Sequence, residues 1–250
     1  MVSRCEHYRN TTSQELYVVT FRIVMDDSHD NTSQELFNLL ESKKDKLNGE
    51  LTMILGGVPV TIQNSDSIGN VIEEWLEKWA DENDITLSRP GGSQDFPDYL
   101  IGKDDAYLEV KAWNFKSSPA FDIANFDSYC NTLVNCPEKI YSDYLIFGYS
   151  LENGILEIKE IYLKKVWEIT RKMGKNGFPL NVQQKNKQIY NIRPSAFHSE
   201  RKTALPSFKN KDEFVKALYN TKDVDTGTKE GTKQLKKFKK ALKKYDSKNP

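Results

Sequence analysis

One amphipathic helix pattern, over residues 67–81, does most to constrain the fold of this chain. Its apolar residues recur at i, i+3, i+4, i+7, i+8 and i+11, the spacing of a helix whose one face packs on a core. These residues are Ile68, Val71, Ile72, Trp75, Leu76 and Trp79. Asp66 or Ser67 can cap the first turn. The pattern therefore predicts a helix that covers a packed interior.

Strand-like segments follow this helix. The runs 97–101 and 106–113 flank a turn-like connection at 102–105, and 144–150 and 155–163 form a second such pair. The other predicted elements are helices over 34–47, 120–134, 164–173 and 232–246 and a strand over 188–192. Helices mixed with hairpin-connected strands predict an α/β fold with a mixed central sheet flanked by helices.

Length and cysteine content limit the class of protein. A chain of 250 residues favours one substantial domain over two small ones. No segment reaches the ~18 apolar residues of a membrane span, and the early apolar run 16–25 is interrupted by Thr20 and Arg22. It also lacks a basic leader and a cleavage site. The odd set of three cysteines is typical of a reducing cytoplasm, with Cys130 and Cys136 expected in the core. We therefore expect a cytoplasmic protein that does not associate with a membrane.

The net charge of zero hides two halves of opposite sign. Residues 1–110 carry 9 Lys and Arg against 21 Asp and Glu, whereas residues 111–250 carry 27 against 15. The segment 206–250 alone holds 13 basic and 6 acidic residues. A basic half can bind a polyanion, and an acidic half can hold groups that bind cations. Two solvated surfaces of opposite sign remain the alternative.

The strongest candidate for catalysis is a group of charged residues on the 97–113 strands. Alternate side chains of a strand share a face, so Glu109 and Lys111 project together while Leu108 and Val110 enter the core. If the two strands are neighbours, Asp98 reaches the same point. The sequence then predicts two carboxylates and one ammonium group in a single cleft.

Such a group suits Mg²⁺ chemistry on phosphate esters. Mg²⁺ prefers carboxylate oxygens and water, and it can activate that water and neutralise charge on a phosphoryl group. A neighbouring lysine can stabilise or help to deprotonate the attacking water. Glu73 and Glu74 flank the apolar stripe of the 67–81 helix, and periodicity alone does not choose between them. An edge strand with a solvated Glu–Lys pair would give the same spacing, but the preceding acidic helix and the following basic half favour an active site.

Pro97-Asp98 and, after ten intervening residues, Glu109-Val110-Lys111 resemble the PD-(D/E)xK signature of type II restriction endonucleases. Further segments are similar to the NgoBV/NlaIV-type family. The similar segments are 69–76, 89–90, 93–98, 108–111, 121–126, 143–147, 163–169 and 190–194. The likeness extends over about residues 50–220. It implies a restriction-endonuclease-like core over 51–225, preceded by an N-terminal extension or subdomain at 1–50 and followed by a basic C-terminal helix at 226–250.

The resemblance also implies an activity. It points to a Mg²⁺-dependent endonuclease that cuts double-stranded DNA at a short palindrome of the GGNNCC type and leaves 5′-phosphate ends. Asp98 and Glu109 would be the metal ligands, Lys111 the water-orienting group, and Glu73 rather than Glu74 the helix carboxylate. A palindrome implies a homodimer. A DNA methyltransferase of the same restriction-modification system would protect host sites without contacting this chain.

Candidate DNA contacts lie on both sides of this motif. They are Ser93, Gln94, Asn125, Lys185, Lys187, Asn191, Arg193, Lys236 and Lys240. Arg and Lys can read guanine and Asn adenine, while lysines of the C-terminal helix can bind phosphates without regard to sequence. Structural alternatives are a turn for Ser93 and Gln94, a structural arginine beside Pro194 for Arg193, and a solvated amphipathic helix for the C-terminal lysines. Two other functions remain open, a structure-selective repair or junction nuclease and a DNA-binding module that does not cut.

Overall fold

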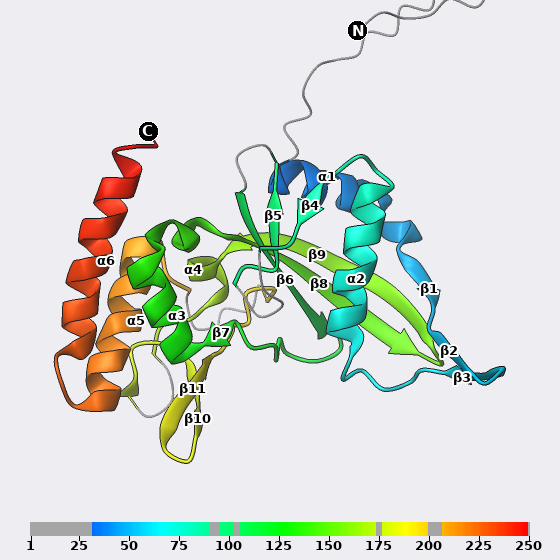
Figure 1. Cartoon of the computed structure of the whole chain (residues 1–250). Helices are drawn as coiled ribbons and strands as arrows, with labels where there is room; N and C mark the ends of the chain where they lie inside the picture. The colour runs from blue at the N-terminus through cyan, green and yellow to red at the C-terminus, as the bar shows by residue number, and fades with distance from the viewer. Residues whose placement is uncertain (1–31, 91–95, 103–105, 174–176, 200–206, 250) are drawn as a thin grey trace, which may run out of the picture.

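The computed structural model describes residues 32–90, 96–102, 106–173, 177–199 and 207–249 (Figure 1). A central sheet of six strands runs through the middle of the molecule. Its strands are β1 (Asn48–Glu50), β4 (Leu87–Ser88), β5 (Tyr99–Ile101), β6 (Ala106–Asn114), β8 (Asp143–Glu152) and β9 (Ile155–Lys165). The helices are α1 (Ser33–Lys43), α2 (Ile68–Asp81), α3 (Phe126–Asn135), α4 (Val166–Ile169), α5 (Lys211–Thr226) and α6 (Glu230–Asp246).

The sheet is mixed, as the sequence predicts. Its strand order is β1-β9-β8-β6-β5-β4, in which β6 and β8 are parallel and the other neighbours are antiparallel. The predicted hairpin of the two strands that bear the charged motif is confirmed, with Tyr99 opposite Leu108. The second predicted hairpin is β8–β9. The mixed central sheet of the α/β fold expected from the sequence is thus observed.

Helices cover both faces of this sheet. One face packs on α1 and α2, and its core includes Leu108 and Val110 of β6. The opposite face packs on α3, α5 and α6, and its core includes Trp113 of β6. Alternation along β6 therefore sends apolar residues to the α2 side and leaves Glu109 and Lys111 on the other face.

The N-terminal helix is part of this interior. Leu36 and Leu40 of α1 are fully buried, and β1 pairs with β9 along the edge of the sheet. Thr32 and Glu35 form a reciprocal capping box that fixes where α1 begins. Residues 33–50 thus contribute directly to the fold.

Two smaller sheets stand apart from the central one. The first joins β7 (Ala124–Asn125), β10 (Val182–Lys185) and β11 (Gln188–Ile192), and the second is the β2 (Thr52–Leu55)–β3 (Val58–Thr61) hairpin. Figure 1 shows both hairpins projecting from the body, β10–β11 at the bottom below α3 and β2–β3 at the right beyond the turn that joins β8 to β9.

Some predicted elements differ from the observed ones. The helix expected over 120–134 begins only at Phe126, because Asn125 caps its first turn by accepting a hydrogen bond from Ser128. The helix expected over 164–173 is only the short α4, since isolated bridges pair residues 170–172 with other segments. Ser67 is the N-cap of α2 but makes no side-chain capping bond. Cys130 is buried as predicted and Cys136 is partly buried, whereas Cys5 lies outside the described residues. None of the helices described is long and apolar enough to cross a membrane.

Candidate active site

Asp98, Glu109 and Lys111 lie together where β5 begins beside β6. The backbone N–H of Asp98 donates to Oε2 of Glu109 at 3.2 Å, and the N–H of Val110 donates to Oδ2 of Asp98 at 2.7 Å. The backbone at Asp98 thus orients the Glu109 carboxylate, and the backbone at Val110, next to Glu109, orients the Asp98 carboxylate. The structure therefore brings Asp98 and Glu109 together, as the strand pattern predicts.

Lys111 completes this group. Its Nζ lies 2.6 Å from Oε1 of Glu109, and the side chains are only 18% and 7% exposed, respectively. Burial raises the pKa of Glu109 to about 7, with Lys111 opposing the rise and Asp98 adding to it. Burial lowers the pKa of Lys111, but the carboxylates of Glu109, Asp98 and Glu73 more than compensate and raise it above its ordinary value. The lysine is thus held charged in a buried site.

Glu73 approaches the group from α2. It is half-buried, and both burial and the charge of Asp98 raise its pKa, while Lys111 lowers it. The Tyr99 hydroxyl donates to the backbone oxygen of Glu73 at 3.0 Å, which ties α2 to β5. Glu74 is exposed. Of the two helix carboxylates, the structure thus couples Glu73 to the cluster.

The donor set fits a hard, hydrated cation. Among the described residues no three His, Cys, Asp or Glu side chains form a ready metal cluster. Asp98 and Glu109 nevertheless offer carboxylate oxygens side by side in a partly buried site. Burial is the main reason that the pKa of Glu109 is raised, so a bound cation would favour the ionised carboxylate there. Mg²⁺, which keeps several waters and needs few protein ligands, suits such a set.

Two tyrosines beside the cluster were not identified from the sequence. Tyr144 of β8 stands opposite Glu109 in the parallel register, and Tyr129 of α3 lies near it. Burial raises the pKa of both hydroxyls, so both remain protonated. The ring of Phe96 packs against both, with centroid distances of 5.6 Å to Tyr129 and 6.4 Å to Tyr144. The pairing register of the parallel strands β6 and β8 places Tyr144 beside Glu109, and no local sequence pattern encodes that register.

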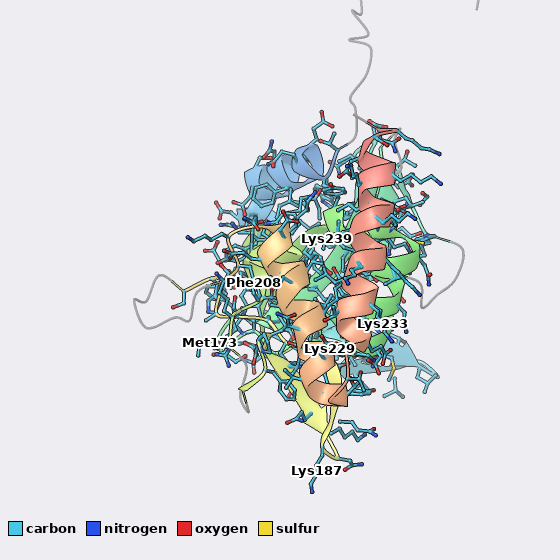
Figure 2. All side chains as sticks on the ribbon, turned by 90° about the vertical axis from the view of Figure 1, so that its left-hand side faces the viewer. Met173, Lys187, Phe208, Lys229, Lys233 and Lys239 are labelled. Atoms are coloured by element: carbon cyan, nitrogen blue, oxygen red, sulfur yellow. The ribbon has the colours of Figure 1, made fainter. Side chains whose placement is uncertain are left out.

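The predicted DNA-contact lysines are exposed. Lys185 and Lys187 lie at the turn of the β10–β11 hairpin, and Lys236 and Lys240 lie on α6. Figure 2 looks onto the α5–α6 side of the molecule and shows Lys187 at the end of that hairpin. All four side chains are therefore accessible to a polyanion.

The other predicted contacts are engaged within the protein. Asn125 donates from its amide to the backbone oxygen of Tyr190 at 3.1 Å. Asn191 is buried, and Arg193 donates to the Asp122 carboxylate and to the backbone oxygen of Ala120. Their base contacts stay predictions, and the structural alternative for Arg193 has a visible basis in these bonds. Ser93 and Gln94 lie outside the described residues.

The mixed sheet and the buried Asp98–Glu109–Lys111 cluster define a restriction-endonuclease-like enzyme. The family model of the NgoBV restriction endonuclease matches residues 30–249, a wider range than the likeness identified from the sequence. The chain belongs to the NgoBV restriction endonuclease family.

Individual relatives agree with this assignment. The chain is 37% identical over 221 residues to the type II restriction enzyme NlaIV of Neisseria lactamica, covering 86% of this chain and 90% of that protein. It is 36% identical over 162 residues to the type II restriction enzyme NgoBV of Neisseria gonorrhoeae, covering 62% and 90%. A solved structure of NlaIV restriction endonuclease superposes with a TM-score of 0.79 at 36% identity, covering 87% and 91%. The chain is thus an enzyme of the type II restriction class.

Proposed function

We propose that this enzyme hydrolyses double-stranded DNA with Mg²⁺ at a short palindrome of the GGNNCC type and leaves 5′-phosphate ends. The observation that carries the proposal is the cluster in which Asp98 and Glu109 orient each other and Lys111 is held beside them. The similarity to the type II restriction enzymes NlaIV and NgoBV supports the site-specific activity.

Each residue of the cluster has a separate role. Asp98 and Glu109 would hold Mg²⁺, which would supply a lowered pKa for the attacking water and positive charge beside the phosphoryl group. Lys111 stays charged because three carboxylates surround it, so it can orient the attacking water and stabilise negative charge on the phosphate. Glu73 is half-buried with a raised pKa, and it is suited to accept a hydrogen bond or a proton from that water.

DNA recognition is divided between two surfaces in this proposal. Lys185 and Lys187, exposed at a narrow hairpin, read guanine in the major groove. Lys236 and Lys240 on α6 attract phosphates and add salt-dependent affinity without sequence preference. Ser93 and Gln94 precede Asp98 closely in the chain, and in this proposal they contact the DNA phosphate backbone near the phosphodiester that is cleaved.

The biological context follows from a palindromic target. Matching half-sites require matching subunits, so the active enzyme is a homodimer. A methyltransferase of the same system modifies the site in host DNA, and both enzymes act in the cytoplasm.

Digestion of plasmid and phage DNA of known sequence tests this function. The wild type with Mg²⁺ is expected to give discrete bands, and these vanish with EDTA or in Lys111→Ala. Lys116→Ala, which removes an exposed lysine just beyond β6, is the matched control and keeps full activity. Mapping the ends checks the GGNNCC site and the 5′-phosphate.

Other outcomes would replace the proposal. A smear in place of bands would favour a structure-selective repair or junction nuclease. DNA that stays intact but shifts on a gel would leave a binding module that does not cut. Circular dichroism of Lys111→Ala separates loss of catalysis from loss of fold.

A further inference from the structure

The β2–β3 hairpin is unusually apolar for a projecting element. All residues of both strands are exposed. The large apolar side chains among them, with their exposed fractions, are Met53 48%, Ile54 70%, Leu55 73%, Val58 62% and Val60 46%. Soluble monomers rarely expose so much contiguous apolar surface, and such patches mark interaction sites.

The same segment is free of charge. Residues 51–65 contain no Asp, Glu, Lys or Arg and form the longest such stretch in a chain of which 29% is charged. Depletion of charged residues is what distinguishes the buried centre of a protein interface from ordinary surface. A surface without cations is also poorly suited to the phosphates of DNA. The hairpin therefore has the composition of a protein-binding element.

The hairpin is built as a stiff arm. Gly56 and Gly57 form its turn with positive φ values of 59° and 79°, the conformation of a tight two-residue hairpin connection. At its base, the N–H of Leu51 donates to the oxygen of Gly154 at 2.8 Å, and the N–H of Ile62 donates to the oxygen of Leu51 at 2.9 Å. The first bond fixes the arm to the β8–β9 turn, and the second closes the base of the hairpin. A preformed arm loses little conformational freedom on binding.

A cavity that suits this arm lies on the same chain. It has a volume of about 320 Å³ and lies between α2, β1 and β9, next to the base of the hairpin. Its apolar lining includes Val71, Trp75, Trp79, Leu51 and Leu156. The hairpin residues are exposed and so do not fill this cavity in their own chain; in Figure 1 the hairpin points outward beyond β1.

We propose that the β2–β3 hairpin is a dimerisation arm that seats its tip, around Leu55 and Val58, in the α2–β1–β9 cavity of a second copy of this chain. A two-fold axis makes the exchange reciprocal, because each copy carries both the arm and the cavity, and this closes the assembly at two subunits. The choice of a second copy rests on the proposed function, which requires a symmetric homodimer. The arm and the cavity themselves rest on the structure.

Light scattering coupled to size-exclusion chromatography of the full chain tests the arm. The wild type is expected to have twice the mass of the chain at micromolar concentration. Leu55→Lys combined with Val58→Lys raises the dimer dissociation constant about 100-fold or more, because charges would enter an apolar cavity. Val224→Lys is the matched control, since Val224 is 54% exposed on α5, and it stays dimeric. Both variants keep the wild-type circular dichroism, because the substituted residues are exposed.

A mixing experiment tests whether the α2–β1–β9 cavity receives the hairpin of the second copy. Val71→Trp fills the cavity and is expected to give a monomer by itself. An equimolar mixture of Val71→Trp with the Leu55/Val58 double variant regains dimer, because one intact arm then meets one open cavity. Recovery of dimer only in the mixture supports the reciprocal exchange.

Other results overturn the proposal. A monomeric wild type, or a hairpin double variant that remains dimeric, refutes the arm, and failure of the mixture to regain dimer refutes the seat. These outcomes are separable from the enzymatic activity, because Lys111→Ala is expected to stay dimeric while it loses cleavage. A dimer that never cuts DNA would contradict the proposed function and leave the arm intact.

Discussion

The buried carboxyl of Glu109 predicts an unusual dependence of stability on pH in the metal-free enzyme. Burial raises its pKa from 4.5 to about 7. Because the folded state favours the protonated form, the stabilising contribution is fully present below pH 4.5 and is lost as the pH rises through about 7. This is the reverse of an ordinary surface carboxylate paired with a lysine, whose contribution is lost on acidification.

The size of the effect follows from the two pKa values. A tenfold change in proton affinity corresponds to about 1.4 kcal/mol, so the difference between 4.5 and about 7 gives about 3 kcal/mol in the free energy of unfolding. Between about pH 5 and about pH 8, roughly 2 to 3 kcal/mol of this should be lost. Lys111 stays charged over that range, because its pKa is held above its ordinary value.

Urea unfolding in EDTA, repeated across this pH range, measures the effect. Glu109→Gln keeps the shape of the side chain and cannot titrate, so subtracting its profile cancels the titration of groups that do not interact with Glu109 and leaves that of Glu109 with its coupled neighbours Asp98 and Lys111. The wild type is expected to lose about 2 to 3 kcal/mol more than the variant towards alkaline pH. Saturating Mg²⁺ should flatten the wild-type profile, because a bound cation favours the ionised carboxylate. Parallel profiles for the two proteins in EDTA would refute this account of Glu109.

Two further predictions concern the helices and the recognition hairpin. Gly231→Ala should lower the free energy of unfolding by about 1 to 3 kcal/mol, because its new Cβ would lie 1.9 Å from the backbone oxygen of Tyr219. Gly69→Ala has open space and should raise the free energy of unfolding by up to about 1 kcal/mol. Thermal melts that rank the two variants the other way would contradict this packing. Lys185→Gln combined with Lys187→Gln should weaken binding to the cognate duplex at least about tenfold more than to random duplex in gel-shift titrations. Equal losses on both duplexes would assign the two lysines to phosphates.

Much of the active site was predictable because its spacing is local. Alternation along β6 puts Glu109 and Lys111 on one face, and a hairpin connection returns Asp98 to them. Both follow from the two-residue period of a strand. The choice of Glu73 over Glu74 was not available from periodicity, because both flank the same stripe. It came from resemblance, and in the structure the Tyr99 hydroxyl holds Glu73 beside Asp98.

Helix α5 was missed for a physical reason. Its buried residues include Thr221 and Lys222, which interrupt the apolar stripe that marks a helix in sequence. Both are satisfied by distant partners: Thr221 accepts a hydrogen bond from the N–H of Leu180, and Lys222 pairs with Asp127 at 2.6 Å. Polar groups can be buried when such partners exist, and partners so far along the chain leave no local signal.

The sequence by itself therefore determined the features that repeat over a few residues: the α2 stripe, the two strand pairs and the charged triplet at the start of β5 and on β6. Tertiary structure alone decided what depends on segments far apart. It pairs Arg193 with Asp122, stands Tyr144 opposite Glu109, and leaves the β2–β3 arm exposed beside an apolar cavity. Short-range periodicity encodes which side of an element is buried, whereas the partner that covers it is chosen only when the whole chain packs.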